Sequence, residues 1–279
     1  RITNNMMISH MMRDFMDMYM GILERGDDGY LHVPLTTSPE WANDELAAWG
    51  SDSTCDLALI RFLGKALLEA AEILKVDDPK SARWRSTLQQ LTPYPRDGKK
   101  DIGPTYGSGI SKWDQGALSL LKGVPLSQSQ RHHAHLMPIY PLGLLTTDGR
   151  AKDRDLIEKT INRWIWRGTG EWTGWSFPWA SLIASRVGKP NMAYDFLRRY
   201  MDGFVTENTF HINGDPSEFG HAFYRYSPMT LEGGFAASAA VMEMLLQSWN
   251  GTIRLFPVLP RWWRDAAFAG LRAEGAFLV

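Results

Sequence analysis

The residue whose position best suits chemistry is an acid at the start of a predicted helix. Glu232 is followed directly by Gly233 and Gly234. A carboxylate at a helix N-terminus is stabilised by the helix dipole, and two glycines let a backbone or a ligand approach closely. We therefore expect Glu232 to activate water as a general base. The alternative is a helix-start acid of purely local value.

A second acid lies in a long polar segment. Glu40 precedes Trp41 within residues 30–49, which are rich in Pro, Thr, Ser, Asn and Asp. Long irregular segments in compact domains are often functional, and an acid beside an aromatic ring suits the binding of sugar hydroxyls. The alternative is a helix start, with Ser38 as N-cap and Pro39 at the first helical position.

Three histidines follow Arg131 in close succession. His132, His133 and His135 are not spaced to share one helical face, and the glutamate of a zinc-binding helix is absent, so we predict no metal and no cofactor. His132 and His135 are expected to share a face and point into a cleft, where they would bind hydroxyls or orient a carboxylate. The alternative is that these two are structural histidines.

Large aromatic residues are abundant, with 12 Trp, 9 Tyr and 12 Phe in 279 residues. Trp175 and Trp179 are one helical turn apart, which suits either a platform for a sugar ring or a place in the core. Both interpretations stay open from the sequence, because most large aromatics fill cores.

Composition excludes several classes of function. The net charge of −1 provides no field that would attract nucleic acid or an anionic membrane surface, and we predict neither partner. Cys55 is the only cysteine, so the sequence has no internal disulfide and no cysteine-based zinc cluster. No apolar run is long enough to cross a bilayer. No phosphate loop, nucleophile elbow or dinucleotide fingerprint is found.

The elements that must position these residues are mostly helices. Apolar residues at helical spacing predict helices over residues 6–23, 55–74, 79–91, 132–145, 153–166, 175–187, 190–204 and 232–249. Alternately long and short connections favour helix pairs arranged in a toroid over a simple bundle. The predicted fold class is therefore mainly α.

The pattern changes after Trp249. Asn250-Gly251 is typical of a turn, and residues 252–256, 268–273 and 275–279 are predicted strands. We predict a helical catalytic domain over residues 1–249 and the beginning of a β-domain over 250–279. The chain starts and ends abruptly, so we expect an excerpt of a longer polypeptide with an incomplete helical barrel.

Taken in order, these segments resemble the catalytic domain of glycoside hydrolase family 95. The resemblance spans nearly the whole chain and rests on residues 37–40, 131–136 with 140–142, 174–176 with Trp179, 232–235 with 243–248, and 253–257 with 271–275. It implies an (α/α)6 barrel between β-domains and hydrolysis of α-L-fucosides, or related α-L-galactosides, with inversion. Inversion needs two carboxyl groups about 6.5–9.5 Å apart, one protonating the leaving oxygen and one activating water.

The chain departs from the family at both carboxyl positions. The family's base is an Asp in the run Asp-Gly-Asn-Phe-Gly, where this chain has Glu232 followed by two glycines. The family's acid is a Glu before Trp, where this chain has Lys112 before Trp113. Asp114 and Glu40 are the nearest substitutes for that acid.

The resulting prediction is an inverting, exo-acting glycosidase. The residues leave its location open, and the resemblance implies a periplasmic or secreted one. Its catalytic residues would be Glu232, with Asp114 or Glu40, and its carbohydrate would bind at residues Trp41, His132, His135, Trp175 and Trp179. One alternative is a carbohydrate-binding relative that has lost catalysis, which Lys112 supports. Another is a polysaccharide lyase on a similar toroid, which would need a Tyr or His base near a cation.

Overall fold

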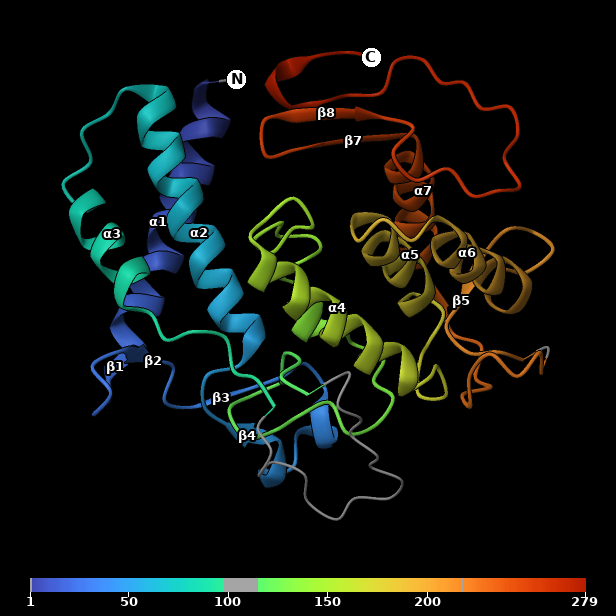
Figure 1. Ribbon diagram of the computed structural model, residues 1–279, viewed down its shortest axis with the longest axis horizontal. Coiled ribbons are helices and arrows are strands. Elements are labelled where there is room, and N and C mark those ends of the chain that lie inside the picture. Colours follow the sequence, from blue (N-terminus) through green and yellow to red (C-terminus); the bar gives the residue numbers. More distant parts are fainter. Residues whose placement is uncertain (1, 98–114, 217) are drawn as a thin grey trace. The chain divides into compact units, whose positions relative to one another are not determined.

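The computed structural model describes residues 2–97, 115–216 and 218–279 and is mainly helical (Figure 1). The described chain forms two compact units. The first contains residues up to 97 together with Leu118–Pro125, and the second contains residues 115–117 and Leu126–Val279. None of the described helices combines the length and apolar character needed to span a membrane.

The first unit is built on three helices. They are α1 (Ile2–Ile22), α2 (Thr54–Leu74) and α3 (Ser81–Gln90), close to the predicted ranges. Their shared core contains Met16, Met20, Val33, Leu57, Ile60, Leu67, Trp84 and Leu91. A Cβ at Gly64 would lie 2.9 Å from Leu88 Cδ2, so the glycine allows α3 to approach α2 closely.

Asp56 joins the start of α2 to its neighbours. Ser53 is the N-cap, since its hydroxyl oxygen accepts the Asp56 N–H at 3.0 Å. The Asp56 carboxylate in turn accepts hydrogen bonds from the hydroxyls of Ser53, Thr36 and Tyr19. The Ser53 cap thereby satisfies a backbone donor that a helix start otherwise leaves unpaired, and the Asp56 carboxylate holds the cap side chain in place.

Short antiparallel strand pairs complete the first unit. β1 (Glu24–Arg25) pairs with β2 (Leu31–His32), and β3 (Thr36–Thr37) pairs with β4 (Trp49–Gly50). Two short 3-10 helices, Trp41–Asp44 and Leu46–Ala48, lie between β3 and β4.

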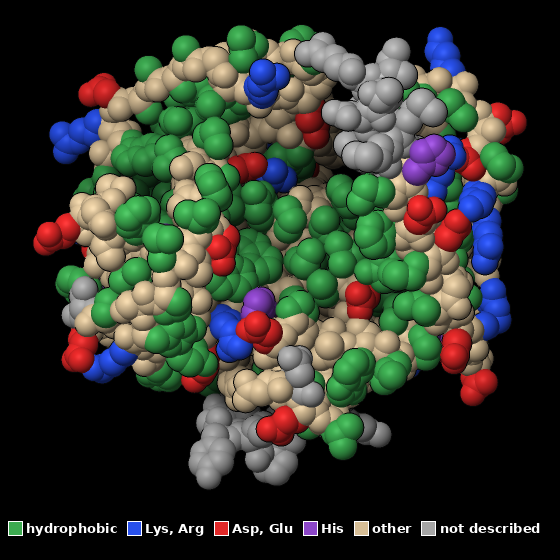
Figure 2. All heavy atoms as spheres, turned by 180° about the vertical axis from the view of Figure 1, so that it is seen from behind, with side chains coloured by type: hydrophobic (Ala, Val, Ile, Leu, Met, Phe, Trp, Pro, Cys, Tyr) green, Lys and Arg blue, Asp and Glu red, His purple; other side chains and the backbone are tan. Residues whose placement is uncertain are grey.

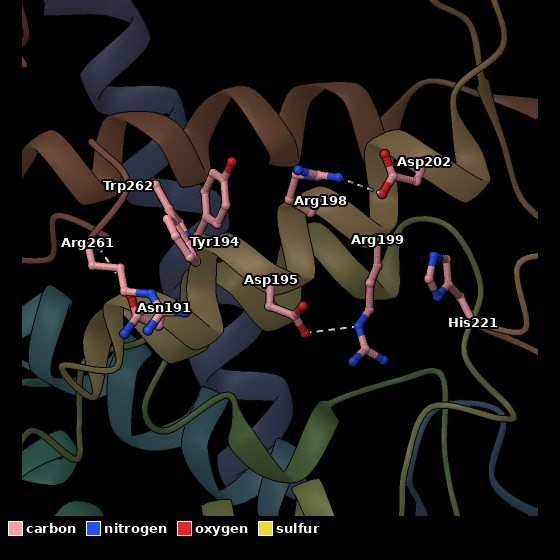
Figure 3. A pocket seen from close by; sticks show the side chains of 9 residues that line it. All are labelled: Asn191, Tyr194, Asp195, Arg198, Arg199, Asp202, His221, Arg261 and Trp262. Atoms are coloured by element: carbon pink, nitrogen blue, oxygen red, sulfur yellow. Dashed lines mark hydrogen bonds and ion pairs between the residues drawn. The ribbon is translucent and has the colours of Figure 1, made fainter. Parts of the chain in front are cut away.

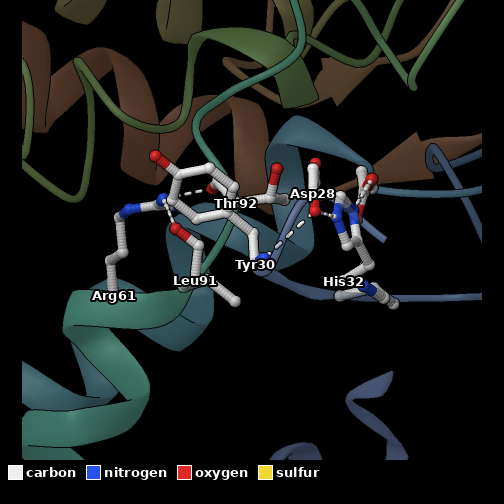
Figure 4. Close-up of polar contacts among 8 residues, drawn as sticks. Asp28, Tyr30, His32, Arg61, Leu91 and Thr92 are labelled. Atoms are coloured by element: carbon white, nitrogen blue, oxygen red, sulfur yellow. Dashed lines mark hydrogen bonds and ion pairs between the residues drawn. The ribbon is translucent and has the colours of Figure 1, made fainter. Parts of the chain in front are cut away.

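His32 is held by two carboxylates at the end of β2 (Figure 4). Its Nδ1 lies 2.7 Å from Asp52 Oδ2, and its Nε2 lies 2.9 Å from Asp28 Oδ1. Burial alone would lower the pKa of His32, but the hydrogen bonds and charges of Asp28 and Asp52 outweigh it and raise the pKa above its usual value. Asp52 also accepts the N–H of Val33 at 2.9 Å, which ties the cluster to the backbone.

The second unit contains the remaining helices. They are α4 (Ala151–Trp166), α5 (Ser176–Arg186), α6 (Pro190–Phe204) and α7 (Glu232–Leu245). α5 packs against both α6 and α7, and its buried Ala180, Ser181, Ala184 and Ser185 are small enough to permit close packing. α7 is largely apolar, yet several of its hydrophobic side chains are exposed, and Phe235 is 72% exposed. Figure 2 shows hydrophobic side chains at the molecular surface.

His133 is a polar residue inside the aromatic core of this unit. It contacts Trp164 and Trp172, which stack on each other with ring centroids 5.3 Å apart. The Trp164 Nε1–H donates to His133 Nδ1 at 3.2 Å, so the ring proton lies on Nε2 and is donated to the Ser176 carbonyl at 3.1 Å. Burial lowers the pKa of His133 to about 3, so the ring is neutral.

The structure corrects four predicted elements. Residues 132–145 contain only the 3-10 helix Ala134–Leu136, and Pro138 and Pro141 lack the N–H groups that a continuous helix would need. The helix predicted over 232–249 ends at Leu245. In place of the last two predicted strands, an isolated bridge joins Arg272 to Leu278 across the short 3-10 helix Glu274–Ala276.

The residues after α7 form a hairpin. β7 (Leu246–Trp249) pairs with β8 (Thr252–Leu255), and Asn250 and Gly251 form the turn with positive φ at both positions, as the sequence predicted. The predicted domain boundary after residue 249 falls inside this hairpin. The Trp249 ring is contacted by the guanidinium groups of Arg186 and Arg254, which fix it beside α5.

We expect the second unit to lose stability as the pH falls from 6.5 towards 3. The unfolded chain protonates His133 and His135 at about pH 6.5, whereas burial lowers both folded pKa values to about 3. Each ring contributes a slope of at most about 1.4 kcal/mol per pH unit. Urea unfolding followed by tryptophan fluorescence should show this slope, and His135→Leu should reduce it. An unchanged slope in the His135→Leu variant would show that burial of His135 does not cause the pH dependence.

In the first unit the pH dependence of stability has the opposite sign, because the pKa of His32 is raised. Its contribution to stability is complete below pH 6.5 and is lost as the pH rises through the folded pKa. NMR titration of His32 should give a pKa above 6.5, and Asp52→Asn should lower it. A wild-type pKa at or below 6.5 would rule out the two-carboxylate arrangement.

Candidate functional site

The predicted site residues fall in both units. Glu232, His132, His135, Trp175 and Trp179 belong to the second unit. In the first unit, Glu40 and Trp41 lie between strands β3 and β4, and Asp114, with Lys112 and Trp113, lies outside the described residues. The site is therefore built from the second unit.

An aromatic row reaches the surface of this unit. The rings of His132 and Trp175 have centroids 4.9 Å apart, and Trp175 stacks on Trp179 at 5.3 Å with an interplanar angle of 24°. All three side chains are partly exposed. Trp175 immediately precedes α5 and Trp179 lies one turn along it, so the helix fixes their spacing. The structure thus brings together three of the residues proposed to bind sugar.

His135 does not belong to this row. It is 1% exposed and lies near Arg163 in the interior, because the segment after His133 turns into a short 3-10 helix. His132 and His135 therefore do not point into the same cleft. We leave His135 out of the proposed sugar site and assign it to the core.

His211 is a site residue that the sequence analysis missed. Its imidazole lies between two glycines from different elements, Gly174 before α5 and Gly233 in the first turn of α7. A Cβ at Gly233 would lie 2.8 Å from His211 Nε2 and closer still to Cε1, and a Cβ at Gly174 would also overlap the ring. Both glycines are thus required by the approach of this ring. The sequence had indicated a close approach at Gly233 but not its partner.

The position of the His211 ring is fixed by the β5–β6 pair. β5 (His211–Ile212) pairs with β6 (Met229–Thr230) so that His211 lies opposite Thr230, and the Thr230 hydroxyl is 2.8 Å from His211 Nδ1. Tyr200 of α6 packs against the ring edge-on with centroids 5.3 Å apart. Burial lowers the pKa of His211 despite opposing contributions from Glu232 and Thr230, so the imidazole is neutral near pH 7.

Glu232 is exposed at the first position of α7. Its Oε2 accepts the backbone N–H of Leu231 at 3.0 Å. The carboxylate is thereby oriented by the backbone just before the helix, where the dipole favours negative charge. Glu232 thus stabilises its helix start and also presents a carboxylate to solvent, and its role as a general base stays a prediction.

Glu171 is a second carboxylate on this unit, also missed from the sequence. Its Oε2 accepts the Tyr224 hydroxyl at 2.7 Å, and the residue is half-buried. This hydrogen bond, with burial, raises the pKa of Tyr224, while Arg131 opposes the shift. Glu171 precedes Trp172, which is the residue order of the family's acid, but this pair lies after the segment Arg131–His135 and not before it. The residue order Glu-Trp was the sequence signal that could have identified Glu171 as a candidate.

The loop that carries Glu171 and Trp175 is joined to the α7 start through His211. The Gly174 N–H donates to the Asn213 carbonyl at 3.0 Å, and the His211 ring separates Gly174 from Gly233. The two carboxylates are therefore carried by elements that pack on one imidazole. Carboxyl groups are the side chains that general acid–base chemistry on a glycosidic bond uses. Among the described residues, no three His, Cys, Asp or Glu side chains are grouped to hold a metal ion.

Glu40 and Trp41 do not open an α-helix. The 3-10 helix starts at Trp41, with Glu40 as its N-cap at φ 50°, and Ser38 contributes its carbonyl to the Trp41 N–H. The predicted capping by Ser38, with Pro39 in the first turn, is therefore wrong. Glu40 is exposed, and its proposed role stays a prediction.

Substituting the adjacent glycines tests the His211 packing. We expect Gly233→Ala to lower the free energy of unfolding by about 1–3 kcal/mol, the usual cost of overpacking, because the methyl group meets the imidazole. Gly234→Ala is the matched control, since its methyl group would lie 3.9 Å from the Tyr200 hydroxyl and would favour the helix. Urea unfolding measures both. Equal stability of the two variants would show that the ring does not fill this space.

Comparison with known proteins identifies the family. The glycosyl hydrolase family 95 catalytic domain matches residues 5–245. Alpha-L-fucosidase 2 of Arabidopsis thaliana is 26% identical over 265 residues, which cover 92% of this chain and 29% of the plant protein. The chain thus spans less than a third of the length of this relative. Both findings confirm the resemblance inferred from the sequence, and the chain belongs to glycosyl hydrolase family 95.

Proposed function

We propose that this chain carries the general base of an inverting, exo-acting glycosidase that releases a terminal α-L-fucose or a related α-L-galactose-like sugar. The observation that carries the proposal is the junction at His211, which joins the Glu171–Trp175 loop to the Glu232 end of α7. Family membership supports the glycosidase class. The similarity to an alpha-L-fucosidase supports the sugar.

Glu232 is proposed as the general base. Its exposure gives water access, and the Leu231 N–H holds Oε2, so that Oε1 is oriented to take a proton. Water would attack the anomeric carbon and transfer its proton to Glu232 while the bond to the leaving oxygen breaks. The neutral His211 beside the helix start keeps positive charge away from this carboxylate.

Glu171 is proposed as the general acid. It would donate its proton to the leaving oxygen, a role that Lys112 at the family's position cannot fill. The Tyr224 hydroxyl bound to Oε2 leaves Oε1 to carry that proton. Asp114 and Glu40 remain alternative acids from the sequence. The row His132, Trp175 and Trp179 would pack against the apolar face of the sugar.

The (α/α)6 barrel is proposed as the architecture around this site. Consecutive helices α5 and α6 are packed and joined by a three-residue connection, as in a toroid of helix pairs. The exposed apolar side of α7 is suited to packing against a further helix. We also propose that residues 1–249 form the helical catalytic domain and that residues 250–279 begin a β-domain.

Paired substitutions separate the two carboxyl roles. Glu232→Gln should lower kcat by about 10²–10⁴-fold on every fucoside, because water activation is needed whatever the leaving group. Glu171→Gln should cause a similar loss on an alkyl fucoside but a small one on an activated nitrophenyl fucoside, whose leaving oxygen needs no proton. Steady-state kinetics with both substrates measure the difference.

Glu158→Gln, on the exposed side of α4, is the matched control and should retain wild-type kcat. Near-normal turnover by the Glu232 variant would remove Glu232 from the mechanism. Equal losses of the Glu171 variant on both substrates would exclude it as the acid and return that role to Asp114 or Glu40.

The carbohydrate-binding alternative is favoured by the replacement of the family's Asp by Glu232 and of its acid by Lys112. It predicts binding of fucosyl oligosaccharides by calorimetry with no turnover on either substrate. Measurable hydrolysis that depends on Glu232 would exclude it.

A further inference from the structure

A pocket of about 860 Å³ opens beside α6, within the second unit (Figure 3). Asn191, Tyr194 and Asp195 line it from α6, and Arg261 and Trp262 line it from the segment after Pro260. Pockets of this size hold ligands of a few sugar rings or a drug-sized molecule.

This pocket is separate from the site around Glu232. On α6, Tyr200 faces His211, whereas Asn191 and Arg198 lie about half a helical turn away at 3.6 residues per turn. The helix therefore presents one face to the candidate active site and another to the pocket. A ligand bound here would not contact the proposed acid or base.

Trp262 provides an exposed aromatic ring that is held in place. It is 57% exposed, and the Arg261 guanidinium lies 4.0 Å from its ring centroid. The backbone is fixed to α6 where the Arg261 N–H donates to Asn191 Oδ1 at 3.2 Å and Trp263 meets Tyr194 edge-on. An exposed aromatic ring on a backbone segment that is anchored at the edge of a pocket is a typical surface for stacking a ligand ring.

The wall beside the tryptophan offers donors and acceptors together. Asp195 accepts from Arg199 Nε at 2.9 Å, and Asp202 accepts from Arg198 Nη2 at 3.4 Å. Exposed ion pairs of this kind are worth little in water, so their groups can exchange partners with ligand hydroxyls. An aromatic ring beside such groups suits a saccharide, which has an apolar C–H face and polar edges.

The charges of the pocket favour an acidic ligand. Arg198, Arg199 and Arg261 face two carboxylates, those of Asp195 and Asp202. Each carboxylate is paired with an arginine of α6, whereas Arg261 stacks on Trp262 and forms no ion pair found in the described chain. We propose that this pocket is a second carbohydrate-binding site that takes an acidic saccharide, with its ring on Trp262 and its anionic group at Arg261.

Calorimetry with trigalacturonate as the probe tests this site on the whole chain. Trp262→Ala should weaken binding about tenfold or more, as expected for loss of a central aromatic contact. The matched control is Trp166→Ala, because Trp166 is 59% exposed and carries Arg167 at 5.2 Å but does not line this pocket. Equal affinities of the two variants, or absence of binding by the wild-type chain, would overturn the proposal.

Two further arms test the ligand class and the independence of the site. Neutral galactotriose should bind more weakly than trigalacturonate or a sulfated galactotriose, and Arg261→Gln should remove that difference. The tighter of the two acidic probes identifies whether a carboxylate or a sulfate is preferred, whereas equal binding of the neutral sugar would contradict the acidic assignment. Glu232→Gln should leave trigalacturonate binding unchanged, so loss of turnover and loss of this site are distinguishable.

Discussion

The arrangement of the candidate site depends on one imidazole occupying the space left by two absent side chains. His211 lies against Gly174 and Gly233, and neither position can gain a methyl group without displacing the ring. The β5–β6 pair and the Thr230 hydroxyl fix the ring from a third direction. A single steric constraint therefore sets the distance between the loop before α5 and the first turn of α7, which carry the two carboxylates.

A second imidazole anchors the aromatic side of the same region. His133 accepts a hydrogen bond from Trp164 and donates one to the Ser176 carbonyl, so its tautomer is fixed by its surroundings. Because Ser176 follows Trp175 directly, this interaction places the exposed row relative to the buried tryptophans. His133 and His211 thus fix neighbouring elements through packing and hydrogen bonds while they are neutral, so neither ring brings a charge into the core.

Most of the helices, and the place of Glu232 at the start of one of them, were predicted from the sequence because they depend on local pattern, whereas the helix predicted over 132–145 was wrong. Residues 190–204 match at both ends, since Pro190 marks the first turn and the apolar spacing is regular. The predicted helix over 232–249 ran too far because Leu245 and Leu246 continue its apolar pattern, whereas the end is set by pairing with Thr252–Leu255. His211 escaped prediction because Thr230 and the two glycines that enclose its ring lie 19 or more residues away. Long-range contacts of this kind leave no periodic signal.

The hydrogen bond from the Leu231 amide to Glu232 links the protonation of this carboxyl to the backbone at the helix start. A carboxyl that has taken up a proton is a weaker acceptor, so each proton gained by Glu232 loosens the residue just before α7. Protonation of Glu232 and fraying of the first helical turn are thus coupled equilibria, so the backbone at the start of α7 responds to the charge on this carboxyl.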